Sequence, residues 1–190
     1  NLIYKDQAFI PGEKGEYPEY LENYRTTDSG LSLFFRPVKI TDEPLLKEFF
    51  YDLSDKTIYR RFFINLLSIS HEKLQKFSVV DFNREMVILA VDIENNRESA
   101  LGIGQYIVDI LSNYAEIAFI VRDDHQKMGI GTELLTYLTY LAKRQGLAGF
   151  TAEVLPVNKP MLSLFAKEGF EIEKKSLGGV IKLKRDFTKD

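Results

Sequence analysis

Apolar and polar positions along the chain repeat with two periods, which predict strands and helices in a definite order. Residues 31–39, LSLFFRPVK, alternate with the period of two that is typical of a strand. The runs EMVILAVDIE at 85–94 and ALGIGQYIVDI at 100–110 are longer apolar strands, and the polar residues 95–98 between them predict a hairpin turn. Further strands are predicted at 115–121, 149–155, 170–175 and 180–187.

Helical periodicity fills the spaces between these strands. Thr41 stands before two acids and a proline, so we predict a helix that has Thr41 as its N-cap. Gly146 follows the amphipathic run 131–145 and marks the end of a long helix. The other helices are predicted to run from 54 to 63, from 70 to 80, and from 156–158 to about 168.

The order of elements, β-α-α-β-β-β-α-β-α-β-β, indicates a mixed α/β (α+β) fold. Consecutive hairpins make the sheet mostly antiparallel, whereas the crossover helix 131–145 makes the strands on either side of it parallel. We expect six to seven strands flanked by helices, in one domain over 31–190. Turn formers break up residues 1–30. Because the chain begins with Asn1, we expect 1–30 to be an extension or linker from a longer chain.

The segment 114–131 carries the clearest chemical signal. An apolar strand leads through a short charged loop into QKMGIG at 126–131, and the amphipathic run follows directly. Glycines let the backbone approach an anion closely, and the free N–H groups of a helix start hold it. The G-x-G-x-x-G and Walker patterns are both absent. Taken alone, the two glycines could also serve only a tight turn.

The pattern Gln-x-x-Gly-x-Gly, after a strand that carries Glu116 and before a helix, resembles the coenzyme A pyrophosphate loop of the GNAT acyltransferase superfamily. The order of elements over 31–187 is similar as well. This resemblance implies the GNAT fold, acetyl-CoA as the donor substrate and an amine as the acceptor. It also implies that the pyrophosphate lies on the N–H groups of Gln126, Met128, Gly129, Gly131 and Thr132, with Lys127 adding charge and Ile130 within the same run.

Two further CoA contacts follow from the resemblance. The pantetheine arm is expected to pair like an added strand beside 119–121, where this strand splays from 151–154. The thioester oxygen is then held by the main-chain N–H of Ile120 or Val121. Asn158 begins a segment similar to the second CoA-contacting piece of the family, so its amide bonds the pantetheine, caps the helix, or does both.

A closer similarity is to bacterial protein-lysine acetyltransferases joined to acyl-CoA synthetase-like modules. It rests on FRPVKITDEPLL, LSDKTIYRRFF, DFNREMVILAV and FTAEVLPVNKPM. Residues 1–30 resemble the end of acetyl-CoA hydrolase/CoA-transferase chains. The resemblances therefore imply a protein lysine as the acceptor and a fused CoA-transferase or hydrolase module as a partner. A small-molecule amine N-acetyltransferase and a non-catalytic CoA-sensing module remain as alternatives.

The candidate general base is Glu116. The chain has no Cys and no G-x-S-x-G elbow, so direct attack by the amine is simpler than a covalent acyl-enzyme. A carboxylate on an apolar strand is partly desolvated, which raises its pKa toward the working pH. Glu85 and Glu153 also lie on strands, as salt-bridged face residues or as alternative bases. Either could serve if Glu116 were fully solvated.

The leaving thiolate has no obvious acid. Many GNAT enzymes carry a Tyr seven residues after the position of Asn158, but here that residue is Phe165. Tyr137 and Tyr140 on the crossover helix are conceivable donors, although helix spacing favours core or surface positions for them. Without a donor, water or direct release of the thiolate would suffice, and the CoA-sensing alternative stays open.

The composition of the chain excludes several classes of binding partner. The net charge of −3 and the pI of about 5.6 argue against non-specific nucleic-acid binding. No apolar run approaches the ~20 residues that cross a bilayer, so we expect a cytoplasmic protein without a membrane partner. The sequence around His71 fails H-E-x-x-H at Gln75, so no metal site is predicted. Arg60 and Arg61 either guide an acidic substrate or form the charged face of a helix.

Overall fold

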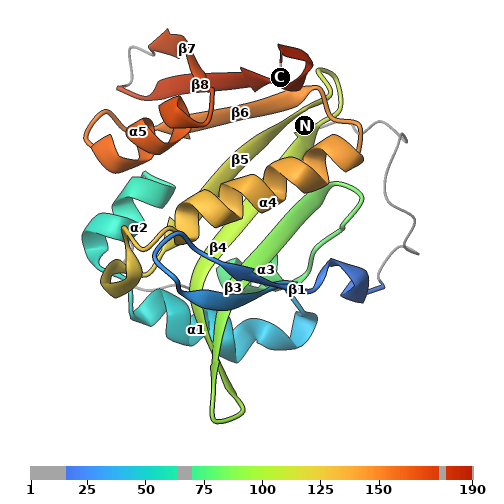
Figure 1. Cartoon of the computed structure of the whole chain (residues 1–190), viewed down its shortest axis with the longest axis vertical. Helices are drawn as coiled ribbons and strands as arrows, with labels where there is room; N and C mark the ends of the chain where they lie inside the picture. The colour runs from blue at the N-terminus through green and yellow to red at the C-terminus, as the bar shows by residue number, and fades with distance from the viewer. Residues whose placement is uncertain (1–15, 64–69, 176–178, 190) are drawn as a thin grey trace.

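The computed structural model describes residues 16–63, 70–175 and 179–189, which form one sheet with helices on both faces (Figure 1). The order of strands across the sheet is β1-β2-β3-β4-β5-β6-β8-β7. The strands are β1 (Asn23–Thr26), β2 (Ser32–Pro37), β3 (Glu85–Glu94), β4 (Arg97–Asp109), β5 (Tyr114–Val121), β6 (Gly149–Val154), β7 (Glu171–Lys175) and β8 (Ile181–Asp186). The helices are α1 (Glu43–Tyr51), α2 (Asp55–Phe62), α3 (His71–Ser78), α4 (Ile130–Arg144) and α5 (Lys159–Lys167). Short 3-10 turns are η1 (Glu19–Leu21), η2 (Ile40–Asp42), η3 (Asp123–His125) and η4 (Phe187–Lys189).

The predicted mixed, mostly antiparallel sheet is confirmed. Only β5 and β6 are parallel, because the crossover helix α4 connects them. The sheet has eight strands rather than six to seven. The additional strand, β1, has four residues of which none is buried, so its sequence carries no apolar alternation.

Residues 16–30 therefore include parts of the sheet, although the sequence suggests an extension there. Strand β1 pairs antiparallel with β2, and Leu21 of η1 is buried in the main core. Tyr137 of α4 donates a hydrogen bond to the carbonyl of Leu21 at 2.6 Å. Residues 1–15 lie outside the described residues, and the extent of any extension stays a prediction.

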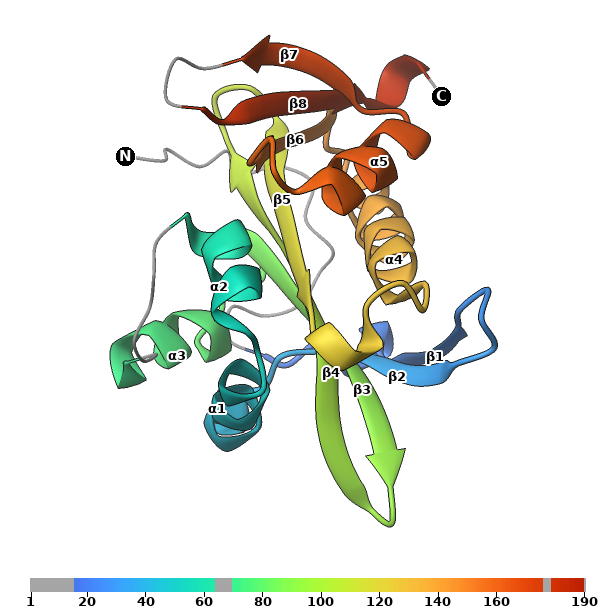
Figure 2. The same cartoon turned by 90° about the vertical axis from the view of Figure 1, so that its left-hand side faces the viewer.

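Two cores lie on opposite faces of the sheet. Strand β3 feeds both, with Met86, Ile88 and Ala90 on one face and Val87 and Leu89 among those on the other. Helices α4 and α5 cover the first face, and α1, α2 and α3 cover the second (Figure 2). Burial on both faces explains why this strand is an almost continuous apolar run.

The N-cap predicted at Thr41 is wrong. Residues 40–42 form η2, and Asp42 takes the N-cap position of α1 without a side-chain cap bond. The carboxylate of Asp42 instead accepts hydrogen bonds from Arg36, at 2.7 and 2.9 Å, and from the backbone N–H of Lys39. Arg36 is fully buried and also donates to Glu98 at 2.6 Å. Pairing this buried charge draws Asp42 inward and sets the start of α1 one residue later.

The other predicted boundaries agree within a few residues. Asn95 and Asn96 have φ of 50° and 61°, which is the type I′ geometry of a two-residue hairpin. Residues 97 and 98, predicted as part of that turn, join β4. Gly146, with φ of 77°, follows the end of α4 as predicted. Strands β7 and β8 pair antiparallel, and residues 176–178 between them lie outside the described residues.

Candidate active site

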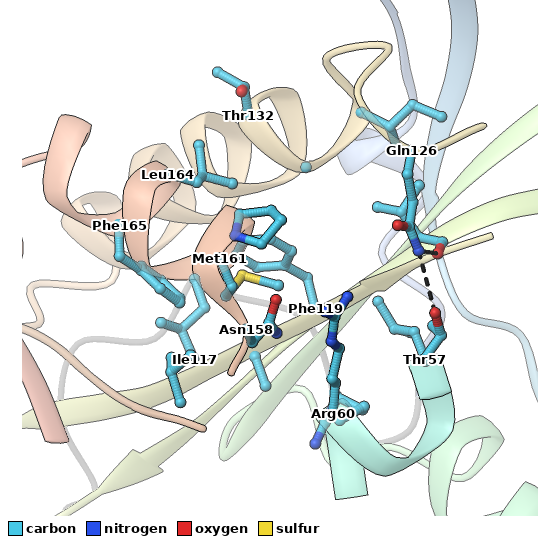
Figure 3. A pocket seen from close by; sticks show the side chains of 18 of the residues that line it. Thr57, Arg60, Ile117, Phe119, Gln126, Thr132, Asn158, Met161, Leu164 and Phe165 are labelled. Carbon is cyan, nitrogen blue, oxygen red and sulfur yellow. Dashed lines mark hydrogen bonds between the residues drawn. The ribbon is translucent and has the colours of Figure 1, made fainter. Parts of the chain in front are cut away.

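A cleft opens where β5 and β6 part. The two strands pair only over residues 114–116 and 149–151, and they diverge beyond Glu116 as the sequence suggests (Figure 1). The cleft measures about 330 Å³ and is lined by α2, β5, the loop before α4, the end of β6 and α5 (Figure 3). One of its walls is thus an open strand edge, and another is the start of a helix.

Two glycines shape the loop before α4. Gly129 has φ of 88°, and a Cβ there would stand 3.0 Å from the Cβ of Thr27. A Cβ on Gly131 would stand 3.2 Å from the ring of Phe119. Neither position accepts a side chain without moving its neighbours, so the glycines keep the main chain itself at the surface of the cleft.

The start of α4 presents main-chain donors. The first bond within the helix runs from the N–H of Glu133 to the carbonyl of Gly129 at 3.0 Å. The N–H groups of residues 130–132 therefore have no partner within the helix. Gly129, Ile130, Gly131 and Thr132 all line the cleft. Free donors at the positive end of a fifteen-residue helix form a binding place for an anion.

Gln126 and Lys127 line the cleft beside this turn. The amide of Gln126 donates to Thr57 at 3.2 Å and to the carbonyl of Val121 at 3.1 Å, which ties the loop to α2 and β5 (Figure 3). Its backbone N–H donates to the carbonyl of Asp123 at 3.4 Å, so Gln126 holds the loop in shape. Lys127 is exposed, with φ of 64°.

Met128 differs from its neighbours because it does not line the cleft. Its carbonyl accepts a hydrogen bond from Ser29 at 2.8 Å, and Ser29 is bonded to Thr27 at 2.8 Å. The turn between β1 and β2 thus braces the glycine loop from outside. The sequence does not reveal Thr27 and Ser29 as part of this site, because a contact across about a hundred residues leaves no local pattern.

The open edge of β5 distinguishes the two candidate donors for an acyl oxygen. The N–H of Arg122 donates to the carbonyl of Leu101 in β4. Ile120, two residues before Arg122, is paired with Ile103 of β4 in the same register. Antiparallel alternation then directs the N–H of Ile120 toward β4, and those of Phe119 and Val121 toward the open edge. Of the pair named from the sequence, Val121 has its N–H directed at the cleft edge, whereas that of Ile120 belongs to the sheet.

Glu116 lines the cleft at the point where β5 leaves β6. Its side chain is open to solvent within the cleft, yet the surrounding walls desolvate the carboxylate. This desolvation raises the pKa of Glu116, as does the negative charge of Glu153, while Arg61 and Lys182 act in the opposite direction. A carboxylate with a raised pKa is suited to accept a proton near neutral pH.

The two alternative carboxylates occupy different surroundings. Glu153 lines the cleft on β6 and forms an ion pair with Lys182 at 3.2 Å. Glu85 does not line it, and it accepts a hydrogen bond from Gln105 at 3.4 Å. Burial raises the pKa of Glu85. Glu116 and Glu153 therefore face one space, and Glu85 lies outside it.

Asn158 and Phe165 form the wall that α5 contributes. Asn158 stands at the N-cap position of α5 but makes no capping bond with its side chain, so its amide remains available to the cleft. Phe165 is 2% exposed, and its ring packs against Phe119 and Phe170 with centroids 5.4 and 4.6 Å apart. A phenyl ring packed against two other aromatic rings thus occupies the position where many GNAT enzymes carry a tyrosine.

The two tyrosines of α4 lie away from the cleft. Tyr137 is buried and bonded to Leu21, and the hydroxyl of Tyr140 accepts a hydrogen bond from Arg144. Within the part of the chain that the structure describes, no tyrosine lines the cleft. His125 lines its edge, with Nδ1 2.7 Å from Asp124.

Helix α2 brings two arginines to the cleft. It is fastened at its start, where Asp123 accepts hydrogen bonds from the Ser54 N–H and hydroxyl and from Thr57, at 2.7 to 2.8 Å. One turn later Arg60 and Arg61 line the cleft, and both are partly buried. Arg61 donates to Gln105 at 3.2 Å.

Neither a group of metal ligands nor a membrane-spanning helix occurs among the described residues. Across residues 16–63, 70–175 and 179–189, no three His, Asp or Glu side chains gather as metal ligands would. The helices in these ranges are all too short or too polar to span a bilayer.

Known proteins are similar to this chain in fold and in sequence. The chain is 25% identical over 166 residues to the acetyltransferase PA5475 of Pseudomonas aeruginosa, covering 87% of this chain and 86% of that protein. It is 27% identical to the GNAT domain of PAT from S. lividans, covering 90% of this chain and all of that one, with a TM-score of 0.82. It also shares its fold with spermidine N-acetyltransferase from Vibrio cholerae in complex with CoA and spermine, at 17% identity over 83% of this chain and 96% of that one, with a TM-score of 0.68.

The sequence model of the acetyltransferase (GNAT) family matches residues 54–170. The match begins just before α2 and ends after α5, so it covers every wall of the cleft. It includes more than half of the chain. The protein therefore belongs to the acetyltransferase (GNAT) family, whose members use acetyl-CoA.

Proposed function

We propose that the protein transfers the acetyl group of acetyl-CoA to the side-chain amine of a protein lysine. The observation that carries this proposal is the position of Glu116, in the same cleft as the glycine loop and at the point where β5 and β6 part. The cofactor and the base then meet along one open strand edge. A protein acceptor is suggested by the sequence similarity to bacterial protein-lysine acetyltransferases.

In this proposal, main-chain groups hold the cofactor. The pyrophosphate accepts hydrogen bonds from the N–H groups of the loop and first turn of α4, at Gly129, Gly131 and Thr132, while Lys127 adds charge. The pantetheine arm pairs along the open edge of β5 beside Val121. The free amide of Asn158 bonds the arm from the opposite wall.

The reaction proceeds by direct attack. Glu116 removes a proton from the ammonium group of the acceptor, directly or through a water molecule, and the neutral nitrogen attacks the thioester carbon. The N–H of Val121 donates to the carbonyl oxygen as negative charge develops on it. The C–S bond then breaks, the nitrogen releases its second proton, which reaches the CoA thiolate through water, and the amide remains on the acceptor.

The test uses labelled acetyl-CoA with three acceptors: host lysate, spermidine and free lysine. Label on protein lysines, lost with Glu116→Gln, supports the proposal. Faster labelling of spermidine or free lysine would assign a small-molecule acceptor. Calorimetric binding of CoA with no transfer to any acceptor would identify a CoA-sensing module, an alternative that the apolar surroundings of Phe165 favour.

The partner module and the cellular location are proposals of the same kind. The similarity of residues 1–30 to the end of CoA-transferases supports a neighbouring CoA-handling module as a partner, in the cytoplasm. Purification of the native protein and measurement of its mass would detect such a module.

A further inference from the structure

We propose that Arg60 and Arg61 form a carboxylate-binding subsite in the acceptor half of the cleft, so that the preferred acceptor is a lysine with an acidic residue beside it. This inference rests on the proposed function and specifies its substrate class. It is carried by the position of the two arginines, by their lack of carboxylate partners, and by the separation of acidic and basic groups around the cleft.

The position of α2 places the arginines away from the glycine loop. Thr57, in the first turn, is the residue that contacts Gln126 of the loop, at 3.2 Å. Arg60 and Arg61 follow three and four residues later, about 5 to 6 Å further along the helix. Arg61 bonds Gln105, which pairs across the sheet with Ala118, between Glu116 and Ile120. Figure 3 shows Arg60 extending from α2 toward the middle of the cleft.

The arginines lack the partners that comparable residues have. Arg36, the most buried arginine, is paired with Asp42 and Glu98, and Arg25 is paired with Glu133 at 2.8 Å. Among the described residues, Arg60 has no hydrogen bond or ion pair, and Arg61 donates to a neutral amide and lies 5.1 Å from the centroid of the Phe62 ring. Burial lowers the pKa of Arg61, and the charge of Glu116 offsets this in part. A partly buried cation without a carboxylate is costly unless a ligand supplies one.

The reaction increases the need of Arg61 for a compensating negative charge. When Glu116 accepts the proton of the acceptor amine, it becomes neutral, and Arg61 loses its nearest compensating charge. A carboxylate on the acceptor would replace that charge during the step. It would also dock beside the amine, because Glu116 and Glu153 face the cleft from β5 and β6 while the arginines face it from α2. A polyamine offers no such group and is expected to be a poor acceptor.

The experiment compares two lysine peptides that differ only in the adjacent residue, Glu or Gln, at fixed acetyl-CoA. We expect kcat/KM for the Glu peptide to be higher by about tenfold or more, the size of one charge-assisted hydrogen bond. Arg60→Gln should bring the ratio to about one. Lys56→Gln removes the same charge from the same helix outside the cleft, so the ratio should stay as in the unchanged protein.

Two further arms separate the possible failures. Succinyl-CoA is compared with butyryl-CoA, since a carboxylate could also come from the acyl group; a succinyl preference that Arg60→Gln removes would overturn the acceptor assignment. Both peptides are also titrated calorimetrically into the protein–CoA complex, which measures the preference without turnover. Equal binding and equal rates would overturn the subsite and leave the transferase intact, whereas a binding preference without transfer would keep the subsite and overturn the proposed transferase.

Discussion

The two halves of the cleft use different parts of the polypeptide. The half formed by the loop and the start of α4 offers main-chain N–H groups, whose positions depend on Gly129 and Gly131. The other half offers charged side chains, chiefly Glu116, Glu153 and Arg60. Main-chain donors fit a group that every donor substrate shares, whereas side chains can change with the acceptor. Under the proposed function, the first half is the cofactor half, which is general, and the second half is the acceptor half, which sets the specificity.

The largest expected effect tests the acceptor half alone. Glu116→Gln should reduce turnover by about 100- to 10,000-fold at neutral pH, the usual range for general-base catalysis. The affinity for acetyl-CoA, measured by calorimetry, should change little. Raising the pH should restore part of the rate, because more of the acceptor amine is then neutral.

The dependence of folding stability on pH provides an internal control for this variant. Because the pKa of Glu116 is raised in the fold, its ionised form is disfavoured, and stability falls as the pH rises through that pKa. Replacement by Gln should therefore leave the protein at least as stable at pH 7 in thermal unfolding. A variant with unchanged turnover would transfer the role of base to Glu153 or to water.

The second prediction tests the cofactor half alone. Gly129→Ala places a Cβ against Thr27 at a left-handed φ, so the loop must shift and its N–H groups lose their alignment. CoA affinity should fall by about 10- to 100-fold, because each hydrogen bond to a charged phosphate contributes about 1.5–3 kcal/mol.

Gly169→Ala is the matched control for this strain. Gly169 has φ of 81°, follows α5 and does not line the cleft. Both variants should lose stability through the left-handed φ, and Gly129→Ala should lose more because its Cβ also meets Thr27, but only Gly129→Ala should lose CoA affinity. Equal affinity in the two variants would remove the loop from the cofactor site.

The third prediction concerns the brace behind the loop. Ser29→Ala removes the hydrogen bond to the Met128 carbonyl, and a bond of this kind contributes about 1 kcal/mol, or roughly fivefold in affinity. CoA affinity should fall by that amount at most, with turnover at saturation unchanged. Ser112→Ala, which removes a serine hydrogen bond in the turn before β5, should not change CoA affinity.

The fourth prediction returns to the acceptor half through its pH dependence. The negative charge of Glu153 raises the pKa of Glu116. Glu153→Gln should lower that pKa, so the acid limb of the kcat/KM profile should move to lower pH. Glu173→Gln removes an acid from β7, which β8 separates from β6, and should leave the profile in place. An acid limb that does not move would show that the charge of Glu153 does not influence the group that titrates in this profile.

The sequence predicted most of the fold, and it singled out the glycine loop that the structure places at the cleft. The glycine loop depends on local features, namely glycine spacing and the apolar run before it, so it is visible in a single chain. The splayed strand edge is expected only from the resemblance to the GNAT superfamily. Other features depend on contacts between distant segments. These are the hydrogen bond from Ser29 to the glycine loop, the direction of the Ile120 and Val121 N–H groups, and the lack of a carboxylate partner for Arg60. The cap at Thr41 failed for the same reason, because a buried arginine decided it.

The smallest expected effect concerns Phe165. The structure surrounds this ring with Phe119 and Phe170, so a hydroxyl added by Phe165→Tyr would enter an apolar site without an evident partner. Burying such a group costs about 1–3 kcal/mol, so the variant should be less stable in denaturant unfolding. Its turnover should stay within about twofold, since general-acid catalysis normally contributes at least about 100-fold where an acid is truly placed. A larger rise in rate, with unchanged CoA affinity, would show that the ring reorients and that thiolate protonation limits the reaction. In that case the cofactor half would supply chemistry from a side chain, and the contrast between the two halves would no longer hold.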